Sequence, residues 1–369
     1  MSIGNIIIPI KIILLNHFFY DIWERKELNN ILKINSGRDY KQLNSGSIPV
    51  YGTGGYMLSV NDKLSDTDAV GIGRKGTIDK PLYLKAPFWT VDTLFYCTSK
   101  ENSDVKFIYL LFQIINWKRY DESTGVPSLS KNTISNIKTY VPKIKEQDYI
   151  SKLFFSLDNT LQLHERKYEE LTLIKKALLQ KLFPKKDGFK PEVRYKNFND
   201  AWEQRKLGEV IISEHKGKVK SIMKGGNTNY LETNYLNGGT AQKVDAIADV
   251  SKDDVLILWD GSKAGTIYHG FEGALGSTLK AYVPKYSGDF LYQILKKNQD
   301  KIYQSYRTPN IPHVIKNFTE KFNVSIPTII EQQEIGDFFK QLDSLITLHR
   351  RKLEKLKQLK KFLLQNMFI

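Results

Sequence analysis

Two long stretches of the chain, residues 146–183 and 331–369, place mostly apolar side chains at alternating intervals of four and three residues. This spacing predicts long helices whose apolar stripe needs a partner helix, as in a coiled coil. Each helix would extend for roughly 50 Å at 1.5 Å per residue. We expect the two helices to pair antiparallel, although each could instead pack only on its own domain. The predicted seam consists of Leu157, Leu161, His164, Leu171, Leu178, Leu342, Ile346, His349, Leu356 and Leu363.

The two helical stretches are also copies of each other. Residues 146–183 and 331–368 align without a gap and are identical at 18 of 38 positions. Upstream segments recur in the same order, such as "FYDIWERKEL" (19–28) with "FNDAWEQRKL" (198–207), "GRKGTI" (73–78) with "SKAGTI" (262–267), and "VPSLSKN" (126–132) with "IPHVIKN" (311–317). The offset varies among these segments but is constant in the helices. The chain is therefore an internal repeat in which a variable domain precedes a helix of fixed length.

The repeat divides the chain into six predicted segments. These are an atypical apolar N-terminal segment (1–18), a first domain (19–145), a first long helix (146–183), a linker (184–197), a second domain (198–330) and a second long helix (331–369). Both domains mix short Val/Ile/Tyr runs with glycine turns, which is typical of strands. Short helices are expected only in segments such as 105–118 and 289–305. The predicted fold class is α+β, with two β-rich domains separated by the helix pair.

The N-terminal segment "IGNIIIPIKIILLNHFF" (3–19) is strongly apolar but contains Pro9 and Lys11. A membrane span needs about 20 consecutive apolar residues, and a signal peptide needs a basic start and a small-residue cleavage site. We therefore favour a packed β-rich segment over a membrane or targeting segment. The one cysteine, Cys97, excludes an intramolecular disulfide and fits a reducing, cytoplasmic compartment.

The formal net charge of +15 favours a polyanionic partner, nucleic acid before an anionic membrane. The helical stretches carry net charges of 0 (146–183) and +3 (331–368), so most of the excess lies in the domains and linker. Several domain loops combine cations, small polar residues and glycine, which suits contact with phosphates and base edges. They are also ordinary turns. The DNA-binding candidates are Arg38, Lys41, Arg74, Lys75, Lys218, Lys220, Lys263, Arg307 and Asn310.

We find no motif for catalysis or for a cofactor. The glycines of "YGTGGY" (51–56) lack the spacing and the βαβ context of a dinucleotide site, and no phosphate-binding loop is present. The six histidines are scattered, and His215, His269 and His313 have no nearby carboxylate or cysteine partners at the spacing of a metal site, so we expect no metal. His164 and His349 fall on the predicted seam, where packing or hydrogen bonding is expected of them.

The duplicated order of these motifs resembles one family. A "W-E-x-[RK]-K-L" opening, a "KGTI" or "AGTI" turn, a "VP" or "IP" pair before "EQ", and a helix through "LD…LH…RK…L" to "LLQ.[LM]F" each occur twice over residues 19–369. This order is similar to that of the DNA-specificity subunit of type I restriction–modification systems. The N-terminal segment departs from it, because the two repeats match only from Phe19 onward.

The resemblance implies a non-catalytic specificity subunit of a restriction system. Each variable domain would be a target recognition domain that reads half of a bipartite site in double-stranded DNA, and the helices would set the spacer between the halves. Two modification (methyltransferase) subunits would supply S-adenosylmethionine, and restriction (endonuclease/translocase) subunits would supply ATP and Mg²⁺ chemistry. Two other hypotheses remain open at this stage. The chain could be a coiled-coil adaptor that assembles proteins without DNA, or an enzyme with an unrecognised site in its glycine loops.

Overall fold

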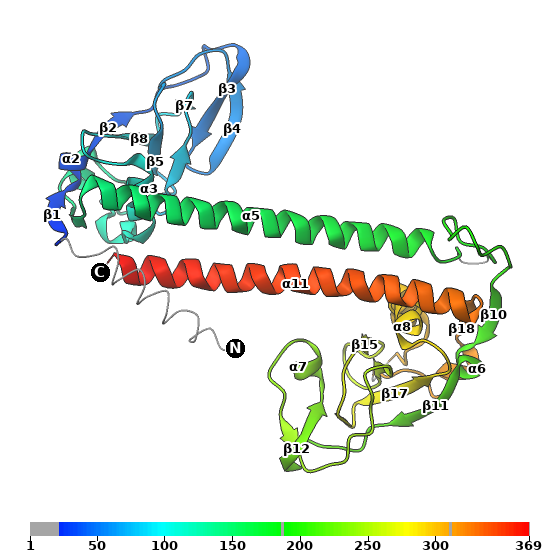
Figure 1. Ribbon diagram of the computed structural model, residues 1–369. Coiled ribbons are helices and arrows are strands. Elements are labelled where there is room, and N and C mark those ends of the chain that lie inside the picture. The colour runs from blue at the N-terminus through cyan, green and yellow to red at the C-terminus, as the bar shows by residue number, and fades with distance from the viewer. Residues whose placement is uncertain (1–21, 186–187, 310–311, 369) are drawn as a thin grey trace. The chain divides into compact units, whose positions relative to one another are not determined.

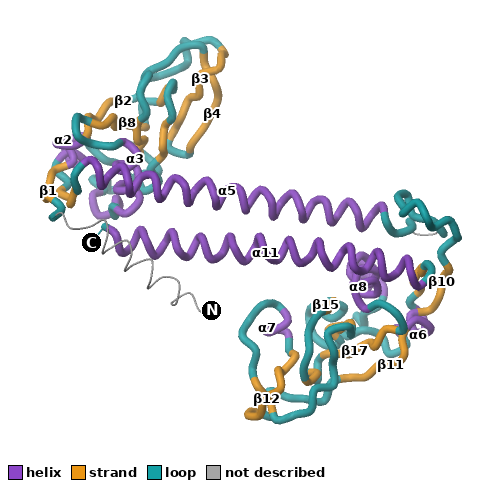
Figure 2. The backbone as a smooth tube through the Cα atoms, in the orientation of Figure 1, coloured by secondary structure: helices purple, strands orange, loops and turns teal. Residues whose placement is uncertain are grey.

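The computed structural model describes residues 22–185, 188–309 and 312–368. The predictions for the N-terminal segment (1–18) and for Asn310 lie outside these residues. The chain divides into two compact units, Met1–Glu165 with Arg351–Ile369 and Arg166–Arg350. Each unit contains one domain and a stretch of each long helix, as the course of the chain in Figures 1 and 2 shows.

The first domain consists of three small sheets and short helices. Its first and last strands pair as β1-β9, a four-stranded sheet has the order β2-β8-β5-β6, and a third sheet has the order β4-β3-β7, with β3 and β7 parallel. The elements are β1 (Glu24–Glu27), α2 (Leu28–Ile31), β2 (Leu32–Ser36), β3 (Ser45–Gly52), β4 (Gly55–Val60), β5 (Ala69–Gly73), β6 (Leu82–Leu84), β7 (Trp89–Thr90), β8 (Leu94–Ser99), α3 (Val105–Ile114), the 3₁₀ turn η1 (Trp117–Tyr120), α4 (Lys131–Ser135) and β9 (Lys138–Val141).

The second domain repeats this topology. Its three sheets have the orders β10-β18, β11-β17-β14-β15 and β13-β12-β16, again with one parallel pair, β12 with β16. The elements are β10 (Glu203–Lys206), α6 (Leu207–Val210), β11 (Ile211–Lys216), β12 (Lys224–Leu231), α7 (Thr233–Leu236), β13 (Lys243–Val244), β14 (Val255–Leu258), β15 (Ile267–His269), β16 (Ala274–Leu275), β17 (Leu279–Pro284), α8 (Gly288–Lys297), α9 (Gln299–Ser305), α10 (Phe318–Lys321) and β18 (Asn323–Ile326). The predicted α+β class and internal repeat are confirmed.

The long helices α5 (Ile144–Lys181) and α11 (Ile329–Met367) both begin two residues earlier than the sequence predicts. Each helix begins two residues after a proline. A glutamine in the first turn of the helix donates a hydrogen bond to the carbonyl of that proline. The Gln147 side chain donates to the Pro142 carbonyl (2.8 Å), and Gln332 donates to Pro327 (2.9 Å). These bonds satisfy carbonyls that precede the helix and fix where it begins.

The first three turns of each long helix contribute to the core of a domain. Ile150 and Phe154 of α5 are buried in the first domain's core, with the Phe107 ring of α3 among their neighbours. Ile335 and Phe339 of α11 occupy the equivalent places in the second domain. These positions are identical in the two repeats because they anchor each helix to its domain.

Farther along, the two helices pair with each other within each unit. In the first unit, Leu157 and Leu161 of α5 pack in one cluster with Leu356 and Leu363 near the end of α11. In the second unit, Leu171 and Leu178 of α5 pack with Leu342 and Ile346 near the start of α11. The early part of one helix therefore meets the late part of the other, so the pair is antiparallel. All ten predicted seam positions are buried or half-buried, His164 and His349 included.

Two equivalent ion pairs lie along this seam. The Lys360 ammonium is 2.6 Å from the Asp158 carboxylate, and the Lys175 ammonium is 2.6 Å from Asp343. Both pairs are at least partly shielded from water.

None of the described helices is long and apolar enough to cross a membrane. Cys97 is fully buried on β8, and burial raises the pKa of its thiol to about 12, which makes it an inert core side chain.

Candidate DNA interface

The turn that follows β5 presents Arg74 and Lys75 at the surface of the first domain. Their backbone amides donate to the Thr93 carbonyl at 2.8 and 3.3 Å. On the other side, the Gly76 amide donates to Pro127 (2.8 Å), and the Arg74 carbonyl accepts from Leu129 (2.9 Å). Gly76 has φ +96°, a conformation that favours glycine. The backbone of this turn is therefore held on both sides, while its two cationic side chains are exposed.

These side chains line a depression of about 690 Å³, which we call the first-domain cup. Its floor includes the Phe95 ring, with the Arg74 guanidinium 5.9 Å and the Lys131 ammonium 5.8 Å from the ring centroid. Both distances are within the range of cation–π attraction. The cup is lined by Ser36, Arg74, Lys75, Asp92, Thr93, Phe95, Glu122, Ser128, Leu129, Ser130 and Lys131.

The loop at the rim of the cup is ordered by its own hydrogen bonds. The Asp121 carboxylate accepts the backbone amides of Ser128 (2.9 Å) and Ser123 (3.0 Å), and these bonds lower its pKa. The neighbouring Glu122 carboxylate accepts the Ser130 hydroxyl at 2.9 Å. These bonds within the loop fix the position of Lys131, the first residue of α4.

The structure brings Arg74 and Lys75 together but places Arg38 and Lys41 outside the residues that line the cup. Both are exposed on the segment after β2, where Trp89 donates to the Arg38 carbonyl at 2.9 Å. Gly37 precedes them because a Cβ there would lie 2.0 Å from the Val91 carbonyl oxygen. Lys131 and Phe95 were missed by sequence reasoning. For Lys131 the sequence contained a signal, because both "VPSLSKN" and "IPHVIKN" have a lysine at this position.

The second domain repeats the backbone of this site with different side chains. The amides of Trp259 and Asp260 donate to the Thr278 carbonyl at 2.8 and 3.2 Å, as Arg74 and Lys75 do to Thr93. Gly261 donates to Pro312 (2.9 Å), as Gly76 does to Pro127. These bonds align the turns at an offset of 185. The alignment of "GRKGTI" with "SKAGTI" at 189 therefore pairs the wrong residues at the start of the turn, because the second turn is longer.

The predicted second-domain residues lie in separate places. Lys263 is exposed within the longer turn, and Lys218 and Lys220 are exposed on either side of buried Val219 after β11. Arg307 is partly occupied inside the domain: its guanidinium donates to the carbonyls of Tyr303 (2.9 Å) and Ser262 (3.1 Å). DNA contact by these residues stays a prediction, and the Arg307 contacts indicate that this side chain also supports the turn.

One histidine has carboxylate neighbours that the sequence spacing concealed. His269 Nε2 is 3.1 Å from the Asp289 carboxylate, 20 residues along the chain, and its Nδ1 is 3.0 Å from the Asp254 carbonyl. Asp253 lies close enough to complete a group of three possible metal ligands. Lys340 of α11, however, donates to the other Asp289 oxygen at 2.9 Å. The imidazole and the carboxylate therefore already have protein partners, which fits a structural network.

The family model for the type I restriction modification DNA specificity domain matches residues 20–173 and 199–358. These two matches cover both repeats and more than half of the chain. The chain belongs to this family. The M. genitalium S subunit of a type I restriction–modification system, known from a crystal structure, is 16% identical and has a TM-score of 0.73 over 95% of this chain and 97% of that one. That likeness shows that the fold is shared.

Two relatives within the family come from Methanocaldococcus jannaschii. The type I restriction enzyme MjaVIII specificity subunit is 31% identical over 50% of this chain and 46% of its own length. The putative MjaX specificity subunit is 21% identical over 69% of this chain and 65% of its own length. The chain thus spans about half to two thirds of the length of these curated relatives.

Proposed function

We propose that this protein is the DNA-specificity subunit of a type I restriction–modification system. Each domain would recognise one half of a bipartite site in double-stranded DNA, and the antiparallel helices would set the spacer between the halves. The observation that carries this proposal is the duplicated turn held between two segments, which presents exposed cations in a member of this family. Lysine and arginine on exposed loops favour DNA because their contact with phosphates releases counterions.

The chemistry of such a system would reside on other subunits. We propose that two modification subunits bind S-adenosylmethionine and methylate DNA, and that restriction subunits use ATP and Mg²⁺. This chain would contribute no catalytic residue, which is consistent with the absence of catalytic motifs from its sequence. Its place would be cytoplasmic, with the DNA and its partner subunits.

The proposal is tested by combining the purified chain with type I modification subunits from the genome that encodes it. We expect adenine methylation at a bipartite motif in single-molecule sequencing of treated DNA, and no methylation when either component is omitted. Salt-dependent binding of duplex DNA by the chain alone is the second expected result. A chain that bound its partner subunits but showed no affinity for DNA would instead support the adaptor hypothesis.

A further inference from the structure

Each domain has a cation beside an aromatic ring next to the turn, but the two side chains occupy opposite positions in the two repeats. The strand register pairs Ser36 with Phe95 in the first domain and Lys216 with Lys280 in the second. Arg74 lies against the Phe95 ring in the first domain. In the second, Lys280 lies 4.4 Å from the centroid of the Trp259 ring. The cation is thus on the turn in one repeat and on the neighbouring strand in the other.

The cations of the first-domain cup have no carboxylate partner. Among the residues that the structure describes, no ion pair or hydrogen bond joins the side chains of Arg74, Lys75 or Lys131 to another group. Two carboxylates, Asp92 and Glu122, line the same cup. Neither is within 4.0 Å of a cation in the described ranges, and Glu122 accepts the Ser130 hydroxyl. Three cationic groups of the cup are therefore available to an incoming anion.

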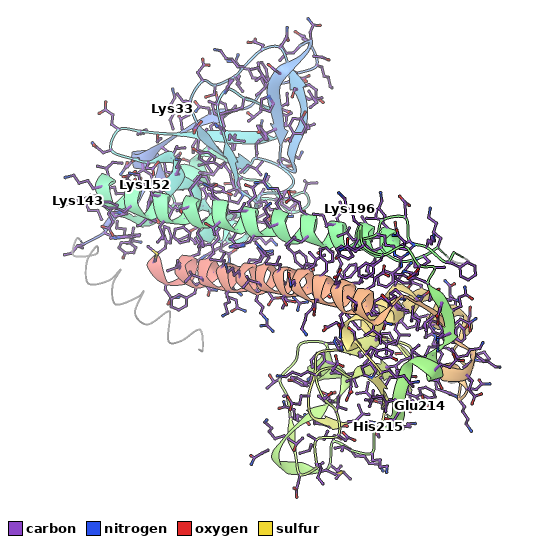
Figure 3. The ribbon with its side chains drawn as sticks, turned by 45° about the vertical axis from the view of Figure 1, so that its right-hand side comes forward. Lys33, Lys143, Lys152, Lys196, Glu214 and His215 are labelled. Carbon is purple, nitrogen blue, oxygen red and sulfur yellow. The ribbon has the colours of Figure 1, made fainter. Side chains whose placement is uncertain are left out.

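In the second domain Trp259 and Asp260 replace Arg74 and Lys75, and exposed Lys316 takes the place of Lys131. The two lysines on the neighbouring strands of that domain are already neutralised. The Lys280 ammonium is 2.7 Å from the carboxylate of Glu214, which lies on β11 and is labelled in Figure 3. The Lys280 side chain is only 13% exposed. Lys216 is 2.8 Å from Asp260, the residue that replaces Lys75 in this repeat. A DNA phosphate could recruit these lysines only by displacing the carboxylates, which gives little net gain.

We infer that the first-domain cup is a binding site for a DNA backbone phosphate, and that Lys216 and Lys280, the paired lysines beside the second-domain turn, do not bind one. This inference rests on the proposed function and adds to it an asymmetry between the domains. An unpaired cation that neutralises a phosphate releases a counterion condensed on the DNA, whereas a lysine that stays paired with a carboxylate neutralises no phosphate and releases none. The hydroxyls of Ser36 and Ser128 provide neutral donors at the same cup.

The test is the salt dependence of duplex DNA binding by the full chain. The probe is a mixed-sequence duplex of about 40 base pairs, long enough for either domain to bind phosphates. Affinity falls as salt rises. The double variant Arg74→Gln with Lys131→Gln is expected to make this fall less steep, by about 0.9 in the slope of log affinity against log salt for each phosphate that it no longer binds. The controls are Lys216→Gln and Lys280→Met, at the second-domain strand positions that correspond to Ser36 and Phe95, and they are expected to leave the slope unchanged.

The outcomes separate the inference from the proposed function. If the native chain shows no salt-dependent DNA binding, the proposed function fails. If it binds DNA and the Arg74 and Lys131 variant keeps the native slope, only the phosphate site is overturned. A slope lowered equally by Lys216→Gln would overturn the asymmetry. Lys216 is half exposed, so this control is informative even if Lys280→Met unfolds the domain. Melting temperatures of all variants identify any that fail to fold.

Discussion

Asp289 joins three elements of the second unit through two hydrogen bonds. His269 of β15 and Lys340 of α11 each bond one of its oxygens, and the carboxylate itself lies in the first turn of α8. Burial raises the pKa of Asp289, but the two hydrogen bonds and the charges of His269 and Lys340 together lower it by more, so its net pKa is below the ordinary value. A carboxylate in the first turn is also stabilised by the helix dipole. The group thus links the sheet to the long helix in its charged form.

Asp289→Asn is expected to lower the free energy of unfolding by about 1–3 kcal/mol near neutral pH. Since the folded-state pKa is depressed, the stabilisation is present above the unfolded pKa of about 3.9 and is lost as pH falls through the folded value. Urea unfolding at pH 6 and at pH 3 should therefore show the difference between native and variant proteins shrinking. Asp300→Asn, an exposed first-turn carboxylate of α9, is the control. A difference that is constant with pH would contradict the assignment.

Charge pairing is the part of the site that the sequence could not predict. Arg74 and Lys75 were correctly placed on an exposed turn, because "GRKGTI" contains the glycine that the turn needs. That Lys280 is neutralised by Glu214 depends on two strands meeting at one register, 66 residues apart in the chain. The same applies to His269 and Asp289. Sequence spacing predicts local chemistry, whereas a tertiary contact decides whether a charge is free.

At the scale of elements, the sequence predicted the repeat, the two helices and their antiparallel pairing. The prediction succeeded because the seam pattern repeats over many turns. Both copies also have an aspartate at one position (Asp158 and Asp343) and a lysine at another (Lys175 and Lys360). A parallel pair would bring identical residues together, aspartate against aspartate and lysine against lysine. The antiparallel pair instead joins each aspartate to a lysine. The sheet orders could not be predicted, since they depend on non-local strand pairing.

Reversing one seam ion pair tests this electrostatic selection. Lys360→Asp alone places a carboxylate beside Asp158 and is expected to destabilise the protein by about 1–3 kcal/mol. Adding Asp158→Lys restores an opposite-charge pair and should recover most of that stability, which denaturant unfolding measures in a double-mutant cycle. The control is the same reversal at Lys357 and Glu165, an exposed pair expected to change stability by less than about 1 kcal/mol. Equal effects at both pairs would refute the seam's role.

At the scale of the whole molecule, the fixed length of the helices is the feature that the proposed function uses. The seam pairs Asp158 with Lys360 in one unit and Lys175 with Asp343 in the other, and both pairs follow one antiparallel numbering, which matches residues 162–168 with residues 350–356. Removing both segments deletes one heptad from each helix, keeps both ion pairs and touches neither domain. Seven residues contribute about 10 Å to a helix, which corresponds to at most about three base pairs of DNA.

We expect this paired deletion to shorten the spacer of the recognised site and leave the half-site bases unchanged. Sequencing of duplexes that the native and shortened chains select from a random library measures both properties at once. Deleting only residues 162–168 is the control, because the unmatched helix loses the seam register and the protein should melt at a lower temperature. An unchanged spacer in a stable paired deletion would mean that the helices do not set the distance. Altered half-site bases would mean that they influence base recognition.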